Sequence, residues 1–430
     1  MLCILYYNRE NRTGGGGPYL RSGPSRMEGI VSYLKVSANG RYFTRDGAPF
    51  FWMGDTIWPA VSDYTPQELA EYFARRREQG FTVAHIMLPW ESGEGDPVPR
   101  AGDIPLWLGN NPATPNEAYF EKLDECVRIA KAHDILLCIL ACGGGLGTFV
   151  DKMKVITADN ARAYGRWLGL RYRDEPGILW SNGFDMPPWM YEDVAREFAA
   201  GILEGDEGRH LLFYHSCGGT SSSHFHNEGW LAANFIQTWA DYQSIHGMVI
   251  ADYHRKPTKP VVHVEGAYEA GTEYPNAPIS SALIRRQAYI SYLSGGFHTY
   301  GHNDLWRKTP VWREAMDARG ANQLTILKNL FTATEWWNLV PDQTLFERFM
   351  QSSHAAARAR DGSFAILYFS HRAEFSIDVG KIGKGAPVAA QWVDPQNGER
   401  SEGFTVAGTG FHKFTSPAAY DDAILLLARG

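Results

Sequence analysis

The stretch GILWSNGFD (residues 177–185) has the pattern that decides the fold: a short, almost wholly apolar run with polar residues at its carboxyl end. Strands that are apolar on both faces are typical of a parallel sheet covered by helices. The stretch VVHVEG (residues 261–266) has the same pattern, and six further runs share it. These six runs begin near Phe50, Thr82, Ile135, Leu211, Asn234 and Phe297.

Amphipathic segments lie between the eight apolar runs, and the runs recur about every 35 residues, which is the length of one strand–helix unit. Eight alternating units predict an α/β fold of the (β/α)8 TIM barrel type over residues 30–340. A hairpin around Asn39-Gly40 is expected to cap the barrel, with Asp46-Gly47 turning into its first strand. The predicted helices are Thr65–Gln79, Asn116–His133, Ala158–Arg173, Pro188–Leu203 and Ser281–Leu293.

The pattern changes at both ends of the chain. Residues 341–430 contain short alternating runs separated by Asp-Gly and Asn-Gly turn signals, which predict a C-terminal antiparallel β-sandwich. Residues 1–29 are rich in Gly, Arg, Ser and Pro and predict an irregular N-terminal extension. This extension has no signal-peptide pattern, so a cytoplasmic location is expected. A periplasmic or secreted location follows instead if the natural start lies elsewhere.

Composition and charge exclude several classes of protein. Hydrophobic residues make up 44% and charged residues 21%, as in ordinary globular chains. The net charge of −7 without a long basic run argues against a nucleic-acid partner. The apolar runs are far shorter than the ~18–20 residues needed to span a membrane. Five cysteines without a CxxC pair predict buried thiols; the oligomeric state stays open.

Functional residues of a TIM barrel come from the carboxyl ends of its strands and from the loops that follow. In this chain nearly every predicted strand end carries a carboxylate, imidazole, amide or indole, whereas a purely structural barrel would spread such groups over its surface. The candidates are Asp55, Trp58, Trp90, Asn182, Asp185, His215, Gln237, Trp239, Glu265, Tyr268, Glu269, Tyr300, His302 and Trp306.

Asp185 and Glu265 stand out because each directly follows a strongly apolar strand, where an unpaired carboxylate is costly. Strands four and seven face each other across the mouth of a barrel, and two facing carboxylates can cleave a glycosidic bond. The alternative for each is an ordinary ion pair. Asp55 is expected to hold a substrate hydroxyl, while Glu269 is either a supporting residue or the true nucleophile.

Other kinds of chemistry lack their motifs. The histidines His215, His224, His226, His298 and His302 do not have HExxH spacing, so no metal is predicted. The glycine run at 143–147 has no acidic ribose partner, and no GxSxG elbow is present. No cofactor is therefore expected.

Four motifs in this order resemble the apiosidase-like glycoside hydrolases, glycoside hydrolase family 140 and its relatives. They are FFWMGDTIW (50–58), WSNGFD (180–185), KPVVHVE (259–265) with Tyr268-Glu269, and GFHTYGH (296–302) with Trp306. WVDPQNG (392–398) is similar to the C-terminal domain of that family, which is named for collagen binding. The resemblance covers about residues 34–430. The chain departs from the family pattern at Asn182-Gly-Phe and at Thr238-Trp-Ala.

The resemblance implies a retaining glycosidase in which Asp185 is the acid/base and Glu265 the nucleophile. We therefore expect an exo-acting enzyme that removes a terminal, furanosyl or apiose-like sugar. An inverting glycosidase with the same pair and a non-catalytic carbohydrate-binding protein are the alternatives. The residues expected to stack on the sugar or bind its hydroxyls are Asp55, Trp58, Trp90, His215, Gln237, Trp239, Tyr268, Glu269, Tyr300, His302 and Trp306.

Overall fold

The computed structural model describes residues 32–90, 100–143, 155–275 and 277–430. The predicted N-terminal extension (1–29), Cys3 and most of the glycine run at 143–147 lie outside the described residues. Within the described parts, no helix combines the length and apolar character needed to cross a membrane. The four described cysteines, Cys126, Cys138, Cys142 and Cys217, are buried free thiols.

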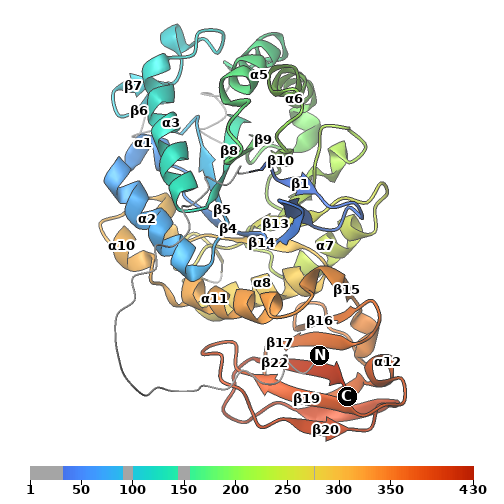
Figure 1. Cartoon of the computed structure of the whole chain (residues 1–430). Helices are drawn as coiled ribbons and strands as arrows, with labels where there is room; N and C mark the ends of the chain where they lie inside the picture. The colour runs from blue at the N-terminus through green and yellow to red at the C-terminus, as the bar shows by residue number, and fades with distance from the viewer. Residues whose placement is uncertain (1–31, 91–99, 144–154, 276) are drawn as a thin grey trace, which may run out of the picture.

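Eight parallel strands form the barrel, as predicted (Figure 1). Neighbouring strands follow the order β10-β9-β8-β5-β4-β14-β13-β12. The ring closes just before β12, where Leu231 bridges Leu212 and the Ala232 amide donates to the Leu212 carbonyl at 2.9 Å. The strands are β4 (Met53–Thr56), β5 (Val83–Met87), β8 (Leu136–Gly143), β9 (Ile178–Gly183), β10 (Leu212–His215), β12 (Asn234–Gln237), β13 (Val261–Glu265) and β14 (Phe297–Tyr300).

Helices surround this ring because each connection between parallel strands needs a crossover. The five predicted helices are present, but the fourth begins later than expected: Pro188–Met190 is a separate 3₁₀ turn (η3). Two further long helices, α7 and α11, were not predicted. The main helices are α2 (Pro66–Gln79), α3 (Glu117–Ala132), α5 (Ala158–Tyr172), α6 (Glu192–Asp206), α7 (Ile245–Tyr253), α8 (Ser281–Leu293) and α11 (Arg319–Thr332).

Local sequence explains how the helices begin and how closely they pack. Thr65 caps α2 in a capping box with Glu68. Helices α5 and α6 pack backbone to backbone through glycines: a Cβ at Gly201 would lie 2.2 Å from the Arg162 carbonyl oxygen, so no larger residue fits there. Short elements complete the barrel, namely α1 (Ala60–Asp63), β6 (Arg100–Ala101), β7 (Ile104–Pro105), η2 (Leu108–Asn110), β11 (Thr220–Ser221), η4 (Ser222–Phe225), α9 (Asn303–Trp306), α10 (Trp312–Ala315) and η5 (Trp336–Asn338).

The N-terminal hairpin differs from the expectation in one respect. After β1 (Lys35–Val36) and β2 (Phe43–Arg45), the Asp46-Gly47 turn leads into a third short strand, β3 (Ala48–Phe50). The first barrel strand therefore begins at Met53 and not at Phe50. The apolar run is continuous in sequence, so it gave no sign that its first residues pair with β2.

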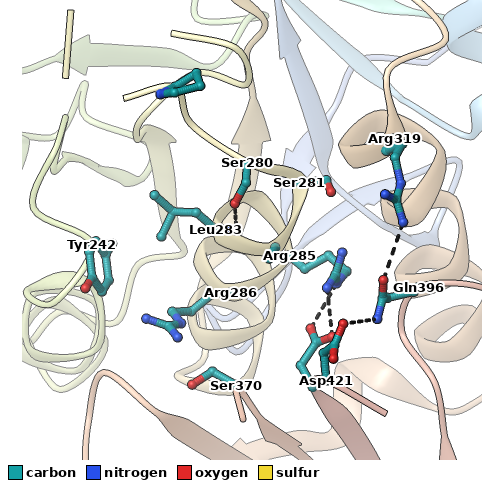
Figure 2. Close-up of a pocket in the computed structure, with 13 residues that line it drawn as sticks. Tyr242, Ser280, Ser281, Leu283, Arg285, Arg286, Arg319, Ser370, Gln396 and Asp421 are labelled. Atoms are coloured by element: carbon teal, nitrogen blue, oxygen red, sulfur yellow. Dashed lines mark hydrogen bonds and ion pairs between the residues drawn. The ribbon is translucent and has the colours of Figure 1, made fainter. Parts of the chain in front are cut away.

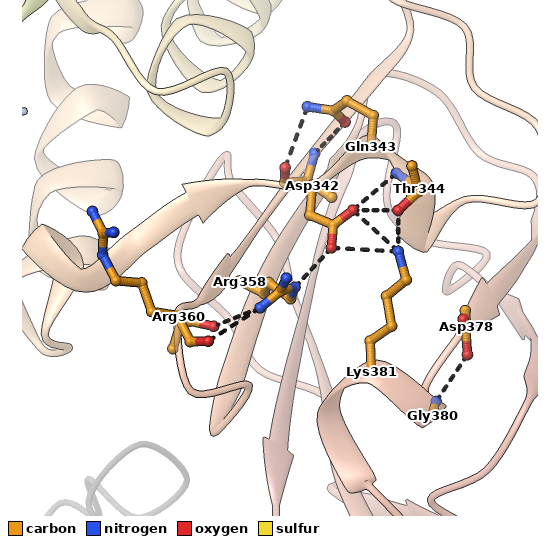
Figure 3. Close-up of polar contacts among 10 residues, drawn as sticks. Asp342, Gln343, Thr344, Arg358, Arg360, Asp378, Gly380 and Lys381 are labelled. Carbon is orange, nitrogen blue, oxygen red and sulfur yellow. Dashed lines mark hydrogen bonds and ion pairs between the residues drawn. The ribbon is translucent and has the colours of Figure 1, made fainter. Parts of the chain in front are cut away.

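The C-terminal domain is antiparallel, as predicted. Its main sheet has the order β15-β16-β17-β22-β19-β20, and β18 pairs with β21 in a second, two-stranded sheet. The strands are β15 (Leu339–Pro341), β16 (His354–Ala359), β17 (Phe364–Phe369), β18 (Glu374–Asp378), β19 (Val388–Val393), β20 (Phe404–Val406), β21 (Phe411–Thr415) and β22 (Ala423–Arg429), with η6 (Gln343–Leu345) and α12 (Gly380–Gly383) between them. A polar network on Asp342 ties the first strand to the rest: its carboxylate accepts from Arg358 at 2.7 Å and from Lys381 at 3.2 Å (Figure 3).

One face of the main C-terminal sheet packs on the barrel. Residues such as Ile366 and Leu426 belong to the same apolar core as the barrel helices. Tyr289 of α8 stacks on Tyr368 of β17 with ring centres 4.7 Å apart. Arg285 of α8 forms a buried ion pair with Asp422 at 2.7 Å, beside the pocket drawn in Figure 2.

Candidate active site

A cavity of about 230 Å³ opens where the strands end, and most of the predicted residues meet there. Seven of them line it, from six different strand ends or the loops behind them. Four further lining residues were not predicted. The lining consists of Trp58, Trp90, Phe184, Asp185, Trp239, Glu265, Tyr268, Glu273, Tyr274, Trp306 and Arg307.

Glu265 is the last residue of β13, and its side chain remains only slightly accessible. Nε2 of His215 lies 3.2 Å from Oε2 of Glu265, but the contact is not aligned as a hydrogen bond. Burial raises the pKa of Glu265 above its ordinary value, and the negative charge of Asp185 raises it further, while His215 opposes both effects. The influence of Asp185 shows that the two carboxylates share one electrostatic environment.

Asp185 is presented to the cavity by an unusual turn after β9. Gly183, Phe184 and Asp185 have successive φ values of 101°, 63° and 45°, in the left-handed region. Non-glycine residues in that region cost roughly 1–3 kcal/mol each and cluster at functional sites. The turn is fixed because the Phe184 amide donates to the His215 carbonyl at 2.8 Å. Its result is a half-buried carboxylate on the cavity wall.

Gln237 connects the two carboxylates. Its Nε2 donates to Oδ1 of Asp185 at 2.8 Å. A register shift between Ile236 and Gln237 pairs Gln237 with Glu265, and the next amide, that of Thr238, donates to the Glu265 carbonyl at 2.9 Å. The end of β12 therefore positions both acidic residues, one through a side chain and the other through the backbone.

Aromatic rings form most of the remaining wall. The indole Nε1 of Trp58 donates to the hydroxyl of Tyr268 at 2.8 Å, which fixes both rings. Trp90 meets Trp306 edge to face with ring centres 5.9 Å apart. Trp239 is 41% exposed at the rim. Rigid apolar rings beside a few polar groups are typical of small-molecule sites.

Asp55 does not reach the cavity, and the expectation that it holds a substrate hydroxyl is contradicted by its position. Its carboxylate is fully buried and forms an ion pair with Arg76. It also accepts from the Tyr72 hydroxyl at 2.6 Å and from the Thr56 amide at 2.8 Å. Burial raises the pKa of Asp55 and Arg76 opposes that rise. Asp55 is therefore a structural anion between β4 and α2.

Glu269 and Tyr300 also lie away from the cavity wall and contact each other. Tyr300 donates to Oε2 of Glu269 at 2.7 Å, and the Gly320 amide donates to Oε1 at 2.9 Å. Gly320 is in the first turn of α11, where free amides attract a carboxylate. Glu269 thus holds the start of α11, and Tyr300 contributes to the same contact. This position does not fit the expected contact of Glu269 with a sugar or its alternative role as nucleophile.

His302 begins α9 and does not line the cavity. Its Nδ1 accepts from the Asp304 amide at 3.1 Å, and burial lowers its pKa to about 4. The imidazole is therefore neutral at ordinary pH and is used as a helix cap. His215 and Gln237, by contrast, lie against the carboxylates themselves.

The residues that sequence reasoning missed are Phe184, Glu273, Tyr274 and Arg307. Phe184 lay inside the quoted strand motif and could have been included. Tyr274 packs on Trp239 with ring centres 5.1 Å apart. Arg307 lies 3.7 Å from Glu273 and 4.2 Å above the Trp306 ring. Glu273 and Tyr274 come eight and nine residues after β13 ends, too far along a loop for the strand-end rule to find them.

In the described ranges, no group of three or more His, Cys, Asp or Glu side chains is placed to hold a metal ion.

Two family models together match most of the chain. The model described as "Apiosidase-like, catalytic domain" matches residues 37–338, and one described as "Putative collagen-binding domain of a collagenase" matches residues 340–428. No curated protein sequence matches the chain.

Several solved structures share the fold. One named as a glycoside hydrolase is 24% identical, covers 93% of this chain and 97% of its own, and has a TM-score of 0.79. A glycoside hydrolase family 5 protein from Bacteroides vulgatus is 25% identical over 92% and 93%, with a TM-score of 0.78. A family 27 β-L-arabinopyranosidase from Geobacillus stearothermophilus is 12% identical over 88% and 97%, with a TM-score of 0.53.

Proposed function

The chain belongs to the apiosidase-like family and is a glycosidase, and from this premise we propose that it removes a single terminal sugar with retention of configuration. In this proposal Asp185 is the acid/base and Glu265 is the nucleophile. Furanosides, apiosides among them, are the first candidate substrates because the family is named for that activity.

One observation carries the proposal: Asp185 and Glu265 line the same small cavity without a cationic partner. Among the described residues, no Lys or Arg lies within ion-pair distance of either carboxylate. Asp55, which lies near the carboxyl end of barrel strand β4, has such a partner in Arg76. A carboxylate that is at least partly buried and has no cation beside it lowers the stability of the fold. The presence of two such groups in one cavity therefore favours a catalytic use.

The proposed reaction follows from this placement. Asp185 donates its proton to the glycosidic oxygen while a carboxylate oxygen of Glu265 attacks the anomeric carbon; the bond to the leaving group breaks and a glycosyl–enzyme ester forms. Asp185, now ionised, removes a proton from water, which attacks the same carbon and releases Glu265. His215, 3.2 Å from Glu265, and Gln237, bonded to Asp185, orient the two groups.

The size of the cavity supports removal of one sugar at a time. At about 230 Å³ it is smaller than the ~300–1,000 Å³ of pockets for drug-sized ligands. The buried rings of Trp58, Trp90 and Tyr268 close it on one side. A single sugar ring fits such a space, whereas the interior of a long chain would need an open groove.

The test is a panel of aryl glycosides that covers furanosides and pyranosides, apiosides included, in both anomeric forms. For the substrate that is cleaved, proton NMR at early times identifies the first anomer released. The proposal expects the anomer of the substrate. The opposite anomer would overturn retention, and release of internal fragments from an oligosaccharide would overturn exo action.

A further inference from the structure

We propose that the polar pocket between the barrel and the C-terminal domain binds the leaving-group side of an oligosaccharide whose terminal sugar occupies the cavity. This inference rests on the proposed function and extends it, because it states that the natural substrate is an oligosaccharide and not a small glycoside. The pocket has a volume of about 490 Å³, and its walls come from both domains (Figure 2).

The pocket and the cavity share two loops. The loop after β12 places Trp239 in the cavity and Tyr242 in the pocket. The loop after β13 places Tyr274 in the cavity and Pro278 in the pocket. Because an extended chain spans at most ~3.6 Å per residue, the paired Cα atoms are no more than about 11 and 14 Å apart. A few sugar units therefore span the two sites.

Both sites also lie at the same end of the barrel. Helix α8 begins at Ser281, after the loop that leaves the carboxyl end of β13 at Glu265. Barrel helices run antiparallel to their strands, so the first turn of α8 lies on the catalytic face. Ser280 and Ser281 line the pocket there.

An exposed tryptophan lies at the rim of the cavity, on one of the two loops that lead to the pocket. The Trp239 indole is 41% exposed and packs on Tyr274 with ring centres 5.1 Å apart and planes at 45°. An exposed indole at the rim of a cavity offers a flat apolar face on which a sugar can stack. Since a cavity of about 230 Å³ has room for one sugar, any further sugar of the substrate must lie outside it and can stack on Trp239.

The pocket has the chemistry of a carbohydrate site. Tyr242 offers an aromatic face, and the Arg286 guanidinium lies 5.3 Å from its ring centre. Within the described part of the chain, no carboxylate pairs with Arg286, whereas the adjacent Arg285 is neutralised by Asp422. Gln396 donates to Asp421 at 3.2 Å on the side contributed by the C-terminal domain.

These groups define the occupant. The pocket is lined by two hydrogen-bond donors of positive charge, Arg286 and Arg319, and by an acceptor of negative charge, Asp421. A ligand with many hydroxyl groups satisfies donors and acceptors together without a net charge of its own. The occupant that fits is therefore a neutral sugar segment with one face on Tyr242.

The test compares two substrates that end in the same sugar: the aryl glycoside found active in the panel, and a defined oligosaccharide. For Tyr242→Ala and Arg286→Met, we expect KM to rise about tenfold with the oligosaccharide, as for the loss of a stacking or hydrogen-bonding contact, and to stay unchanged with the aryl glycoside. Tyr242→Phe keeps the ring and should resemble the wild type. Arg128→Met, on the exposed face of α3, is the remote control.

Each other outcome overturns the inference. An equal loss with both substrates would show that Tyr242 and Arg286 act only by supporting the catalytic loops. No loss with either substrate would show that the pocket takes no part in binding. If the wild-type enzyme released no aglycone from any glycoside, the proposed function itself would fail. That failure is distinguishable, because the wild-type enzyme is assayed before any variant is compared with it.

Discussion

Two pairs of carboxylates lie at or soon after the carboxyl ends of barrel strands in this protein, and they have opposite surroundings. Asp55 is held by Arg76 and Tyr72. Glu269 is held by Tyr300 and the Gly320 amide. Asp185 and Glu265 have no cation in reach among the described residues and line a cavity. All four were candidates from the sequence, which singled out Asp185 and Glu265 as the catalytic pair.

The difference lies in what the neighbouring elements supply. Helix α2 brings a guanidinium to Asp55, and the first turn of α11 brings a free amide to Glu269. At Asp185 and Glu265 the neighbours are an amide and an imidazole, which orient a carboxylate without neutralising it. The first pair is expected to contribute to stability and the second to catalysis, and each prediction below tests that division.

The largest effect is expected for Glu265→Gln. The amide keeps the shape of the side chain but cannot attack an anomeric carbon, so turnover should fall by about 10⁴-fold or more, roughly 5.5 kcal/mol in the barrier. The melting temperature should hardly change, because no ion pair is lost. Steady-state kinetics on the active aryl glycoside and a thermal melt measure both quantities. An inactive variant that also melts far earlier would place Glu265 with the structural pair.

Asp55→Asn should show the reverse. Removing one charge from a buried ion pair leaves Arg76 uncompensated, which typically costs about 3–5 kcal/mol. Urea unfolding should report that loss, while kcat of the remaining folded enzyme stays within a few fold of the wild type. Tyr72→Phe, which removes one hydrogen bond to the same carboxylate and no charge, is the milder control. A stable but inactive Asp55→Asn enzyme would contradict the division.

Glu269→Gln should be smaller again. The neutral amide can still accept from the Gly320 amide, but it loses the charge that favours the start of α11. We expect about 1–3 kcal/mol of lost unfolding free energy. Tyr300→Phe should cost a similar or smaller amount through the same contact. Large loss of kcat with unchanged stability would instead support Glu269 as a nucleophile.

The sequence was sufficient for the fold because the signal is repeated. Eight apolar runs and the helices between them specify a barrel even though the first run includes β3 and the helices α7 and α11 were missed. Helix α7 is hard to find because its own apolar residues are not confined to one face, as in MVI at 248–250, so the helical period is weak. The antiparallel domain was equally visible in its Asn-Gly and Asp-Gly turns.

The candidate site was predicted less completely. Strand ends identified Asp185, Glu265 and five aromatic residues of the wall. They could not separate Glu265 from Glu269, because that choice depends on Gly320, a residue about fifty positions away. The same holds for Asp55. Its partner Arg76 lies in a predicted helix, and the sequence does not show which strand residue that helix contacts. Long-range partners decide which polar residue is free to react.

The smallest effect concerns the coupling within the catalytic pair. The negative charge of Asp185 raises the pKa of Glu265, so Asp185→Asn should lower it. Glu265 must be ionised to attack; its activity is lost as pH falls through its pKa, and the acidic limb of kcat/KM should therefore move to lower pH. An aryl glycoside with a highly activated leaving group is the substrate to use, because its departure needs no acid. Asp55→Asn is the matched control and should leave this limb in place, since Asp55 is paired with Arg76 and does not line the cavity. An acidic limb that stays fixed in Asp185→Asn would contradict the coupling, because Glu265 would then ionise without sensing the charge of Asp185.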